Sequence, residues 1–132
     1  MADSFDYIII GAGSAGSVLA NRLSAGDATV CVLEAGPRDR NPWIHIPAGF
    51  MKTLIHPTVN WNYESEPSAG TAGRRVYAPR GKTLGGSGSI NGHVYNRGQR
   101  ADFDTWGQMG NRGWSYADVL PYFRRSERRI GG

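Results

Sequence analysis

Short apolar runs near the N-terminus alternate with a mixed segment, and this pattern predicts a strand, a helix and a second strand. Residues 5–10 (FDYIII) are rich in aromatic and β-branched side chains and contain neither Pro nor Gly. Such a run is typical of a strand buried on both faces of a sheet. Four apolar residues then recur on one helical stripe: Ala15, Val18, Leu19 and Leu23. Residues 28–33 (ATVCVL) form a second apolar run, so a β-α-β unit is predicted over residues 5–34.

A glycine-rich turn joins the first predicted strand to the predicted helix, with Gly11, Gly13 and Gly16 in the pattern Gly-x-Gly-x-x-Gly. In dinucleotide-binding units, the first glycine permits a tight turn and the second lets a pyrophosphate approach the backbone. The third lets the helix pack closely on the strand. The free amides and positive dipole end of the helix then face the phosphates. Glu34 lies 18 residues beyond Gly16, about where a carboxylate binds the ribose hydroxyls of an adenine nucleotide.

The alternative for this turn is a purely structural role, because glycine-rich turns are common. The strand before it, the helix after it and the acid at the right distance together favour dinucleotide binding. An acid rather than an arginine at residue 34 disfavours a 2′-phosphate, so NADP is not expected.

Length and cysteine content narrow the class of protein. A chain of 132 residues suits one domain. The single cysteine, Cys31, excludes a disulfide within the chain and fits a reducing compartment. The first residues are acidic, and the apolar run after them is too short for a signal peptide or a membrane span. We therefore predict a cytoplasmic protein without a membrane segment.

Charge and histidine placement exclude further classes. Thirteen of the fifteen basic residues are arginine, and they are scattered except for one group: Arg124, Arg125, Arg128 and Arg129. We interpret this group as a solvated helix face; the alternative, a nucleic-acid patch, lacks interleaved aromatic residues. No cluster of His, Cys, Asp or Glu has the spacing of metal ligands. His45 and His56 have no acidic or nucleophilic residue at a spacing that would indicate a catalytic pair. We predict no nucleic-acid partner and no metal.

Residues 35–80 show neither a helical nor an alternating period. Five prolines interrupt residues 38–80, with Trp43, Trp61 and Tyr63 in between. This composition predicts a long ordered excursion packed by aromatic side chains rather than a disordered linker. A short strand is predicted over residues 76–78.

A second glycine cluster covers residues 81–92 (GKTLGGSGSING). Its small residues expose successive backbone amides, and Arg80 and Lys82 add positive charge, so an anion-binding nest is plausible. The alternative is a flexible surface loop. Beyond it, a helix is predicted over residues 102–109, and a second follows Ser115, an N-cap residue with Asp118 three positions on.

The second cluster resembles the signature segment of the glucose–methanol–choline (GMC) oxidoreductases. The matching pattern is Gly81-Lys82-x-Leu84-Gly85-Gly86-Ser87-Gly88-x-Ile90-Asn91-xxx-Tyr95-xx-Gly98-xxxxx-Asp104. The flanking segments resemble the family too: residues 60–63, 77–81, 113–116 and 121–123. The likeness covers the whole chain and is strongest to the choline-dehydrogenase-like and the aryl-alcohol- or furfural-oxidase-like branches.

The resemblance implies an α/β fold in which a Rossmann-like β-α-β domain binds FAD, not NAD. In that family the first motif holds the ADP part of the cofactor, and the second motif lies along the rest. Carried over to this chain, the cofactor-binding residues are Gly11, Gly13, Ser14, Ala15, Gly16, Glu34, Ala35, Trp61, Arg80, Leu84, Gly86, Ser87, Asn91, Gly92, His93 and Val94. The last four would sit by the isoalloxazine ring. Holding a flavin at both ends requires more than one phosphate turn.

The sequence departs from some family members at the position before Asn91. Those members carry a histidine there that is linked covalently to the flavin, whereas this chain has Ile90. Non-covalent FAD is therefore expected. We interpret the nearby His93 as a packed or hydrogen-bonded neighbour; the alternatives are an attachment site or a base.

The resemblance further implies an enzyme that oxidises the CH–OH group of a small-molecule alcohol, with hydride passing from the alcohol carbon to flavin N5. Two alternatives remain. One is a non-redox relative of the hydroxynitrile lyase or fatty-acid photodecarboxylase type. The other is a truncated, non-catalytic FAD- or nucleotide-binding module.

Family members are several times longer than this chain, and their alcohol-binding domain and catalytic pair come from sequence beyond residue 132. We therefore expect residues 1–132 to be the N-terminal part of a FAD-binding domain, without catalytic residues or a substrate domain. Alone, it is expected to fold poorly and to be inactive. Its predicted parts are residues 5–34 (the dinucleotide unit), 35–80 (the excursion), 81–104 (the second flavin-contacting motif) and 115–129 (a helix).

Overall fold

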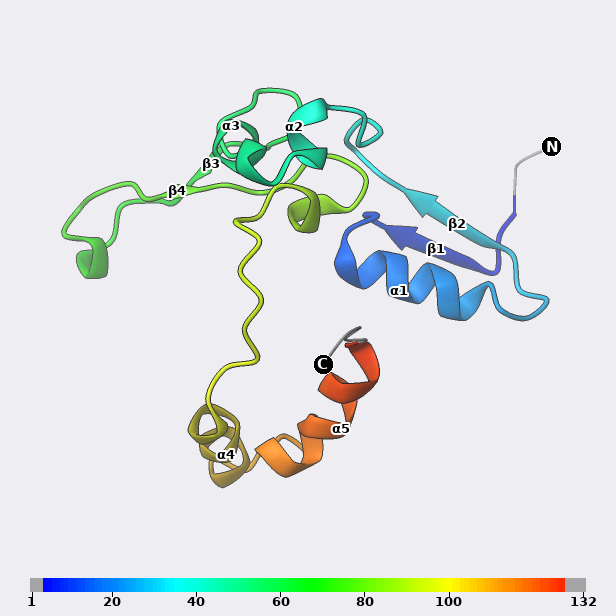
Figure 1. Ribbon diagram of the computed structural model, residues 1–132, viewed down its shortest axis with the longest axis vertical. Helices are drawn as coiled ribbons and strands as arrows, with labels where there is room; N and C mark the ends of the chain where they lie inside the picture. The colour runs from blue at the N-terminus through cyan, green and yellow to red at the C-terminus, as the bar shows by residue number, and fades with distance from the viewer. Residues whose placement is uncertain (1–3, 128–132) are drawn as a thin grey trace. The chain divides into compact units, whose positions relative to one another are not determined.

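The computed structural model describes residues 4–127, which form two compact units (Figure 1). Residues 4–93 make up the first unit and contain both glycine motifs. Residues 94–127 make up the second unit, whose described part is built from a pair of α-helices. Both glycine clusters therefore belong to one folded body, whereas the predicted second motif (residues 81–104) crosses the boundary between the two units.

The first unit opens with the predicted β-α-β arrangement. Strand β1 (Tyr7–Ile10), helix α1 (Ser14–Leu23) and strand β2 (Val30–Leu33) follow one another. The two strands pair in parallel, from Tyr7 opposite Val30 to Ile10 opposite Leu33. Parallel strands need such a crossover connection, and Figure 1 shows α1 running alongside the pair. The predicted α/β fold is confirmed.

One face of this strand pair packs on α1, and the opposite face is exposed. Ile9 is only 8% exposed, and a Cβ atom at Gly16 of α1 would lie 3.3 Å from its Cγ2 atom. Ile8 and Ile10 are 61% and 78% exposed, because alternate residues of a strand face opposite sides. The expectation of a strand buried on both faces is therefore wrong for the described residues, since α1 covers a single face.

Residues 35–80 form an ordered excursion with short elements. It contains helices α2 (Pro42–His45) and α3 (Phe50–Thr53). Asn41 caps α2 by accepting a hydrogen bond from the backbone N of Trp43 at 3.0 Å. Strand β3 (Tyr63–Glu64) pairs antiparallel with β4 (Tyr77–Ala78), which confirms the short strand predicted over residues 76–78.

The second unit consists of α4 (Arg100–Gln108) and α5 (Tyr116–Ser126). Rings from the two helices meet around Phe103, whose centroid lies 5.5 Å from that of Phe123. The helix predicted from residue 102 begins two residues earlier, at Arg100, because Gln99 takes the capping position. The backbone N of Gln99 donates to Asp102 Oδ2 at 2.9 Å.

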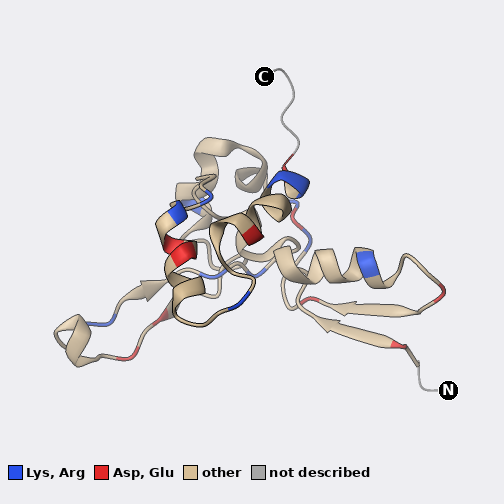
Figure 2. Cartoon of the chain, turned by 90° about the horizontal axis from the view of Figure 1, so that it is seen from below, with Lys and Arg blue, Asp and Glu red and all other residues tan. Residues whose placement is uncertain are grey.

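The start of α5 agrees with the sequence pattern, because Ser115 and Asp118 form a capping box. The helix was predicted to reach about residue 129 and ends at Ser126. Arg124 and Arg125 lie in its last turn, whereas Arg128 and Arg129 lie outside the described residues. In the first unit, Figure 2 shows a single basic band on α1, which has Arg22 in its last turn.

Asp6 connects the start of β1 to the segment before β2. Its Oδ2 atom accepts hydrogen bonds from the backbone N of Thr29 at 2.7 Å and from the Thr29 hydroxyl at 2.8 Å. These bonds lower the pKa of the Asp6 carboxyl below its ordinary value. A group with a lowered folded-state pKa stabilises the fold above its unfolded-state pKa and loses that effect as pH falls through the folded-state pKa.

We predict that Asp6→Asn lowers the thermal midpoint at neutral pH and that this difference shrinks as pH falls from below the unfolded-state pKa toward the lowered folded-state pKa of Asp6. Thermal unfolding followed by circular dichroism between pH 7 and pH 3 measures the effect. Asp27→Asn, in the same α1–β2 connection, is the matched control. A constant difference between Asp6→Asn and wild type across the pH range would contradict the prediction.

Candidate cofactor-binding site

The two glycine motifs meet in the first unit. The backbone N of Gly85 donates to the carbonyl of Ala12 at 2.8 Å, and Gly13 and Gly85 form a parallel β-bridge. A Cβ atom at Gly86 would lie 3.0 Å from the Cα atom of Gly13. Gly85 and Gly86 also have φ angles of +85° and +56°, which glycine adopts without steric cost. The contact between the motifs therefore requires glycine at these positions.

The first turn agrees with the predicted roles of its glycines. Gly11 has a φ of +93°, and its backbone N donates to the carbonyl of Leu33 at 2.7 Å, at the end of β2. Gly16 is buried, and a Cβ atom there would lie 2.0 Å from the carbonyl oxygen of Gly11. Gly16 is thus required for α1 to pack against its own turn.

Gly13 differs from Gly16, because the protein leaves room for a side chain there. The nearest atom to a Cβ at Gly13 would be the Cα of Gly86, at 3.8 Å, and its φ is −79°. Gly13 is also the N-cap of α1 and offers no side-chain cap to the first-turn amides. An α-helix leaves its first N–H groups without intrahelical partners, so those of α1 are suited to an external anion.

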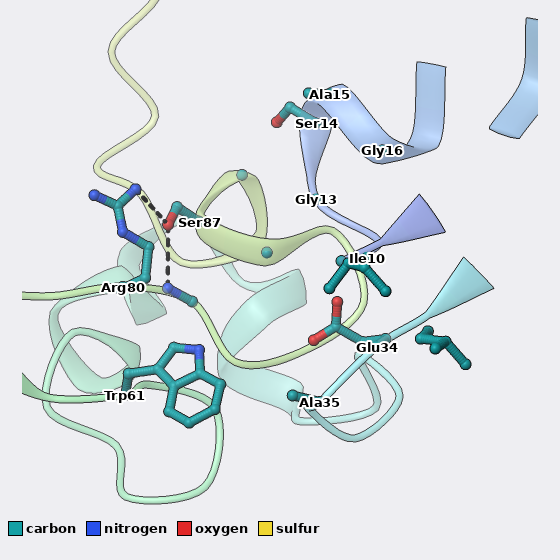
Figure 3. A pocket seen from close by; sticks show the side chains of 15 residues that line it. Ile10, Gly13, Ser14, Ala15, Gly16, Glu34, Ala35, Trp61, Arg80 and Ser87 are labelled. Atoms are coloured by element: carbon teal, nitrogen blue, oxygen red, sulfur yellow. Dashed lines mark hydrogen bonds between the residues drawn. The ribbon is translucent and has the colours of Figure 1, made fainter. Parts of the chain in front are cut away.

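A cavity of about 540 Å³ lies beside the joined motifs. Figure 3 shows Trp61 and Arg80 on the opposite side of this cavity from the turn that begins α1. Its lining residues are Ile10, Gly11, Gly13, Ser14, Ala15, Gly16, Leu33, Glu34, Ala35, Trp61, Arg80, Gly81, Gly86, Ser87 and Gly88.

The structure brings most of the predicted cofactor-binding residues to this cavity. Eleven of them line it: Gly11, Gly13, Ser14, Ala15, Gly16, Glu34, Ala35, Trp61, Arg80, Gly86 and Ser87. They come from four separate stretches of the chain (residues 11–16, 34–35, 61 and 80–87), so the fold gathers them. Their contact with a cofactor stays a prediction.

Five predicted residues do not line the cavity: Leu84, Asn91, Gly92, His93 and Val94. The backbone N of Leu84 donates to the carbonyl of Pro37 at 3.1 Å. Asn91 Oδ1 accepts from the backbone N of His93 at 2.8 Å, and Phe50 packs edge-to-face on the His93 ring at 6.3 Å. The role of these five beside a flavin stays a prediction.

Sequence reasoning missed four lining residues: Ile10, Leu33, Gly81 and Gly88. Ile10 and Leu33 are the last residues of β1 and β2, and ligands of α/β sheets bind at the carboxyl ends of the strands. That rule could have identified both. Gly81 and Gly88 belong to the second motif itself but were not assigned to the site; a Cβ at Gly81 would lie 2.2 Å from the backbone of Gly86.

Glu34 holds the first turn in place with both carboxylate oxygens. Oε2 accepts a hydrogen bond from the backbone N of Ala12 at 2.8 Å, and Oε1 accepts one from the backbone N of Gly36 at 2.9 Å. Figure 3 shows this carboxylate pointing toward the end of β1. A carboxylate has about four acceptor positions, so each oxygen can still accept from a ligand hydroxyl. The predicted ribose contact and the structural contacts are therefore compatible.

The opposite wall carries positive charge and an aromatic ring. Ser87 Oγ accepts hydrogen bonds from the backbone N of Gly81 at 3.1 Å and from the guanidinium of Arg80 at 3.4 Å. The Trp61 ring stacks on Tyr63, with 5.7 Å between centroids, and the Lys82 ammonium lies 4.3 Å from the Trp61 centroid. Both Lys82 and Tyr63 thus hold the orientation of the indole.

Other kinds of site are not found in residues 4–127. This part of the chain has no helix that is long and apolar enough to cross a membrane. It also contains no group of three or more histidine, cysteine or acidic residues that could hold a metal ion. His45 and His56 contact neighbouring residues of the excursion, Asp39 for the first and Asn41 and Thr58 for the second.

Comparison with known proteins identifies the family. A family model described as GMC oxidoreductase matches residues 5–131. The chain belongs to the GMC oxidoreductase family. The resemblance inferred from the glycine motifs is therefore confirmed.

Several GMC-type relatives are similar over nearly the whole chain. The oxygen-dependent choline dehydrogenase of Sinorhizobium fredii is 55% identical over 128 residues, which are 96% of this chain and 23% of that protein. The crystal structure of pyridoxine 4-oxidase from Mesorbium loti matches with a TM-score of 0.79 and 40% identity, over 91% of this chain and 24% of that one. A fungal aryl-alcohol oxidase matches with a TM-score of 0.70 and 26% identity, over 96% of this chain and 22% of its own. The chain thus spans about a quarter of the length of these GMC relatives.

We predict that Glu34→Gln lowers the free energy of unfolding by about 1–3 kcal/mol, because glutamine has one acceptor oxygen for two backbone N–H groups and leaves one unpaired. Denaturant unfolding without added ligand measures the effect. Glu64→Gln, on the exposed strand β3, is the matched control. Equal stability of the two variants would show that the two amides do not depend on the carboxylate.

Proposed function

We propose that this chain is the FAD-binding N-terminal part of a flavin-dependent oxidoreductase that acts on the CH–OH group of an alcohol. The observation that carries the proposal is the junction of two glycine motifs beside one cavity. Binding of any dinucleotide would explain the first motif but not the second. A long cofactor such as FAD, which extends past the first turn, would explain both. The GMC family and relatives named choline dehydrogenase, pyridoxine 4-oxidase and aryl-alcohol oxidase support it.

The residues of the cavity fit the diphosphate part of FAD. The first-turn amides of α1 have no side-chain cap, and Gly13 leaves open space where a side chain would stand. The guanidinium of Arg80 lines the other side and would offset phosphate charge. Glu34 would bind the adenosine ribose hydroxyls through acceptor positions that Ala12 and Gly36 do not use.

This part of the chain would bind and orient the cofactor and would not transfer the substrate proton. FAD, when bound, would supply the acceptor for the hydride of the alcohol. Trp61 lines the cavity beside Arg80, and the second motif would limit how far the cofactor can shift. Binding is proposed to be non-covalent, since Ile90 is an aliphatic side chain that is 2% exposed and cannot form a bond to the flavin.

We expect the purified intact protein to show the two visible absorbance bands of oxidised flavin and to release all its FAD on acid precipitation. Anaerobic addition of choline, pyridoxine or an aryl alcohol is expected to bleach those bands with at least one alcohol. A protein without flavin bands would contradict FAD binding. A flavoprotein that no alcohol bleaches would contradict alcohol oxidation and favour a non-redox relative.

A second prediction concerns Gly13 alone. Gly13→Ala is expected to leave the thermal midpoint of the apoprotein unchanged and to weaken FAD binding by about tenfold or more, because the methyl group fits the protein but occupies the space for the phosphate. Titration of the apoprotein with FAD, followed by flavin fluorescence, measures the affinity.

Gly26→Ala is the matched control, because a Cβ at Gly26 would have no atom within 4 Å and Gly26 does not line the cavity. If Gly13→Ala and Gly26→Ala bind FAD with equal affinity, the phosphates do not bind next to Gly13, and the prediction is wrong.

A further inference from the structure

A single buried amide side chain lies behind the wall of the cavity formed by Trp61 and Arg80. Asn60 is 2% exposed and does not line the cavity. Its neighbours Trp61 and, across an antiparallel bridge, Gly81 do line it. The side chain therefore reaches the proposed cofactor only through other residues.

The hydrogen bonds of Asn60 determine the orientation of its amide. Oδ1 accepts from the backbone N of Asn62 and from the backbone N of Arg80, each at 2.9 Å. Nδ2 donates to the carbonyl of Leu54 at 2.5 Å and to the Tyr77 hydroxyl at 3.2 Å. Two backbone donors face one end and a backbone acceptor faces the other, so only an amide satisfies all of them.

The hydrogen bonds that Asn60 accepts fix the backbone around Trp61 and Arg80, the two residues of this cavity wall. The bond to the N of Asn62 closes a turn around Trp61, and Asn62 accordingly has a φ of +52°. The bond to the N of Arg80 lies beside the bond from Trp61 N to the carbonyl of Arg80, at 2.8 Å. Asn60 thus connects the turn that carries the indole to the segment after β4 that carries the guanidinium.

We propose that Asn60 is a positioning residue for FAD: its buried amide sets the separation of Trp61 and Arg80 and thereby the shape of the cofactor cavity. The inference rests on the proposed function and adds a determinant of affinity to it. A buried polar group without a hydrogen-bond partner is costly. Replacement of Asn60 would leave such groups unpaired, so the backbone around Trp61 and Arg80 is expected to shift.

Asn60→Asp is the sharpest test, because it keeps the two accepted bonds and loses the donated ones. At about pH 8 the ionised carboxylate faces the Leu54 carbonyl, and FAD binding is expected to weaken roughly 10- to 100-fold. As pH is lowered until the introduced carboxyl is protonated, its O–H group can donate to the Leu54 carbonyl again. Affinity is then expected to recover to within about threefold of wild type at the same pH.

The titratable neighbour in contact with this position is the Tyr77 hydroxyl. The Arg80 guanidinium points to Ser87, and the Lys82 ammonium lies over the Trp61 ring. Neither cation therefore donates to the introduced carboxyl. The recovery at low pH reports on the protonation of that carboxyl.

The matched control is Asn111→Asp in the second unit, where Asn111 Nδ2 donates to the carbonyl of Trp106 at 3.0 Å. This variant loses the same kind of bond and is expected to bind FAD like wild type at both pH values. FAD affinity and the visible circular dichroism of the bound flavin are measured at a temperature at which each apoprotein is folded. If wild type itself binds no FAD, the proposed function fails; if wild type binds and Asn60→Asp binds equally at pH 8, only this inference fails.

Tyr77→Phe provides a milder variant if Asn60→Asp does not fold. It removes the hydroxyl that accepts from Asn60 Nδ2, and we expect FAD binding to weaken about threefold at both pH values. A lower thermal midpoint with unchanged affinity and unchanged flavin circular dichroism would make the amide purely structural and would overturn the inference.

Discussion

The hydrogen bond from Gly85 to Ala12 determines how the first unit is assembled. It joins a turn near the N-terminus to a segment more than half the chain away, and their backbones meet without intervening side chains. On the side of the second motif this approach requires glycine, because Gly85 and Gly86 have positive φ angles and a Cβ at Gly86 would crowd the Cα atom of Gly13. The end of β1, the start of α1 and the segment 80–88 are thereby brought to one cavity, and the chemistry proposed for this protein depends on that arrangement.

Local rules explain why much of the fold could be predicted from the sequence. An uninterrupted β-branched run, a Gly-x-Gly-x-x-Gly turn and a serine three residues before an aspartate each act within a few residues, so β1, α1 and the start of α5 followed from the pattern. Gln99 is an unusual capping residue, and the start of α4 was accordingly misplaced. Burial of Ile8 and Ile10 could not be inferred, because it depends on which segments cover the sheet.

The site was predictable where a motif specifies it and not where tertiary contacts do. Glycine spacing indicated Gly13 and its neighbours, and the resemblance to the GMC signature segment implied Gly86 and Ser87. The role of Asn60 depends on Arg80, 20 residues on, and on Leu54, six residues back; no periodicity records such a network. Most residues that line the cavity are thus visible in the sequence, whereas those that hold them in position require the structure.

Glu34 accepts hydrogen bonds from the backbone amides of both Ala12 and Gly36. This double role has a consequence for engineering cofactor preference. Exchanging the acid at the end of the second strand for a basic residue is the obvious route toward a phosphorylated ribose. In this protein that exchange would also release the turn in front of α1, so a redesign must first supply new acceptors for both amides. The side chain that is proposed to bind the ribose thus also holds the turn in place.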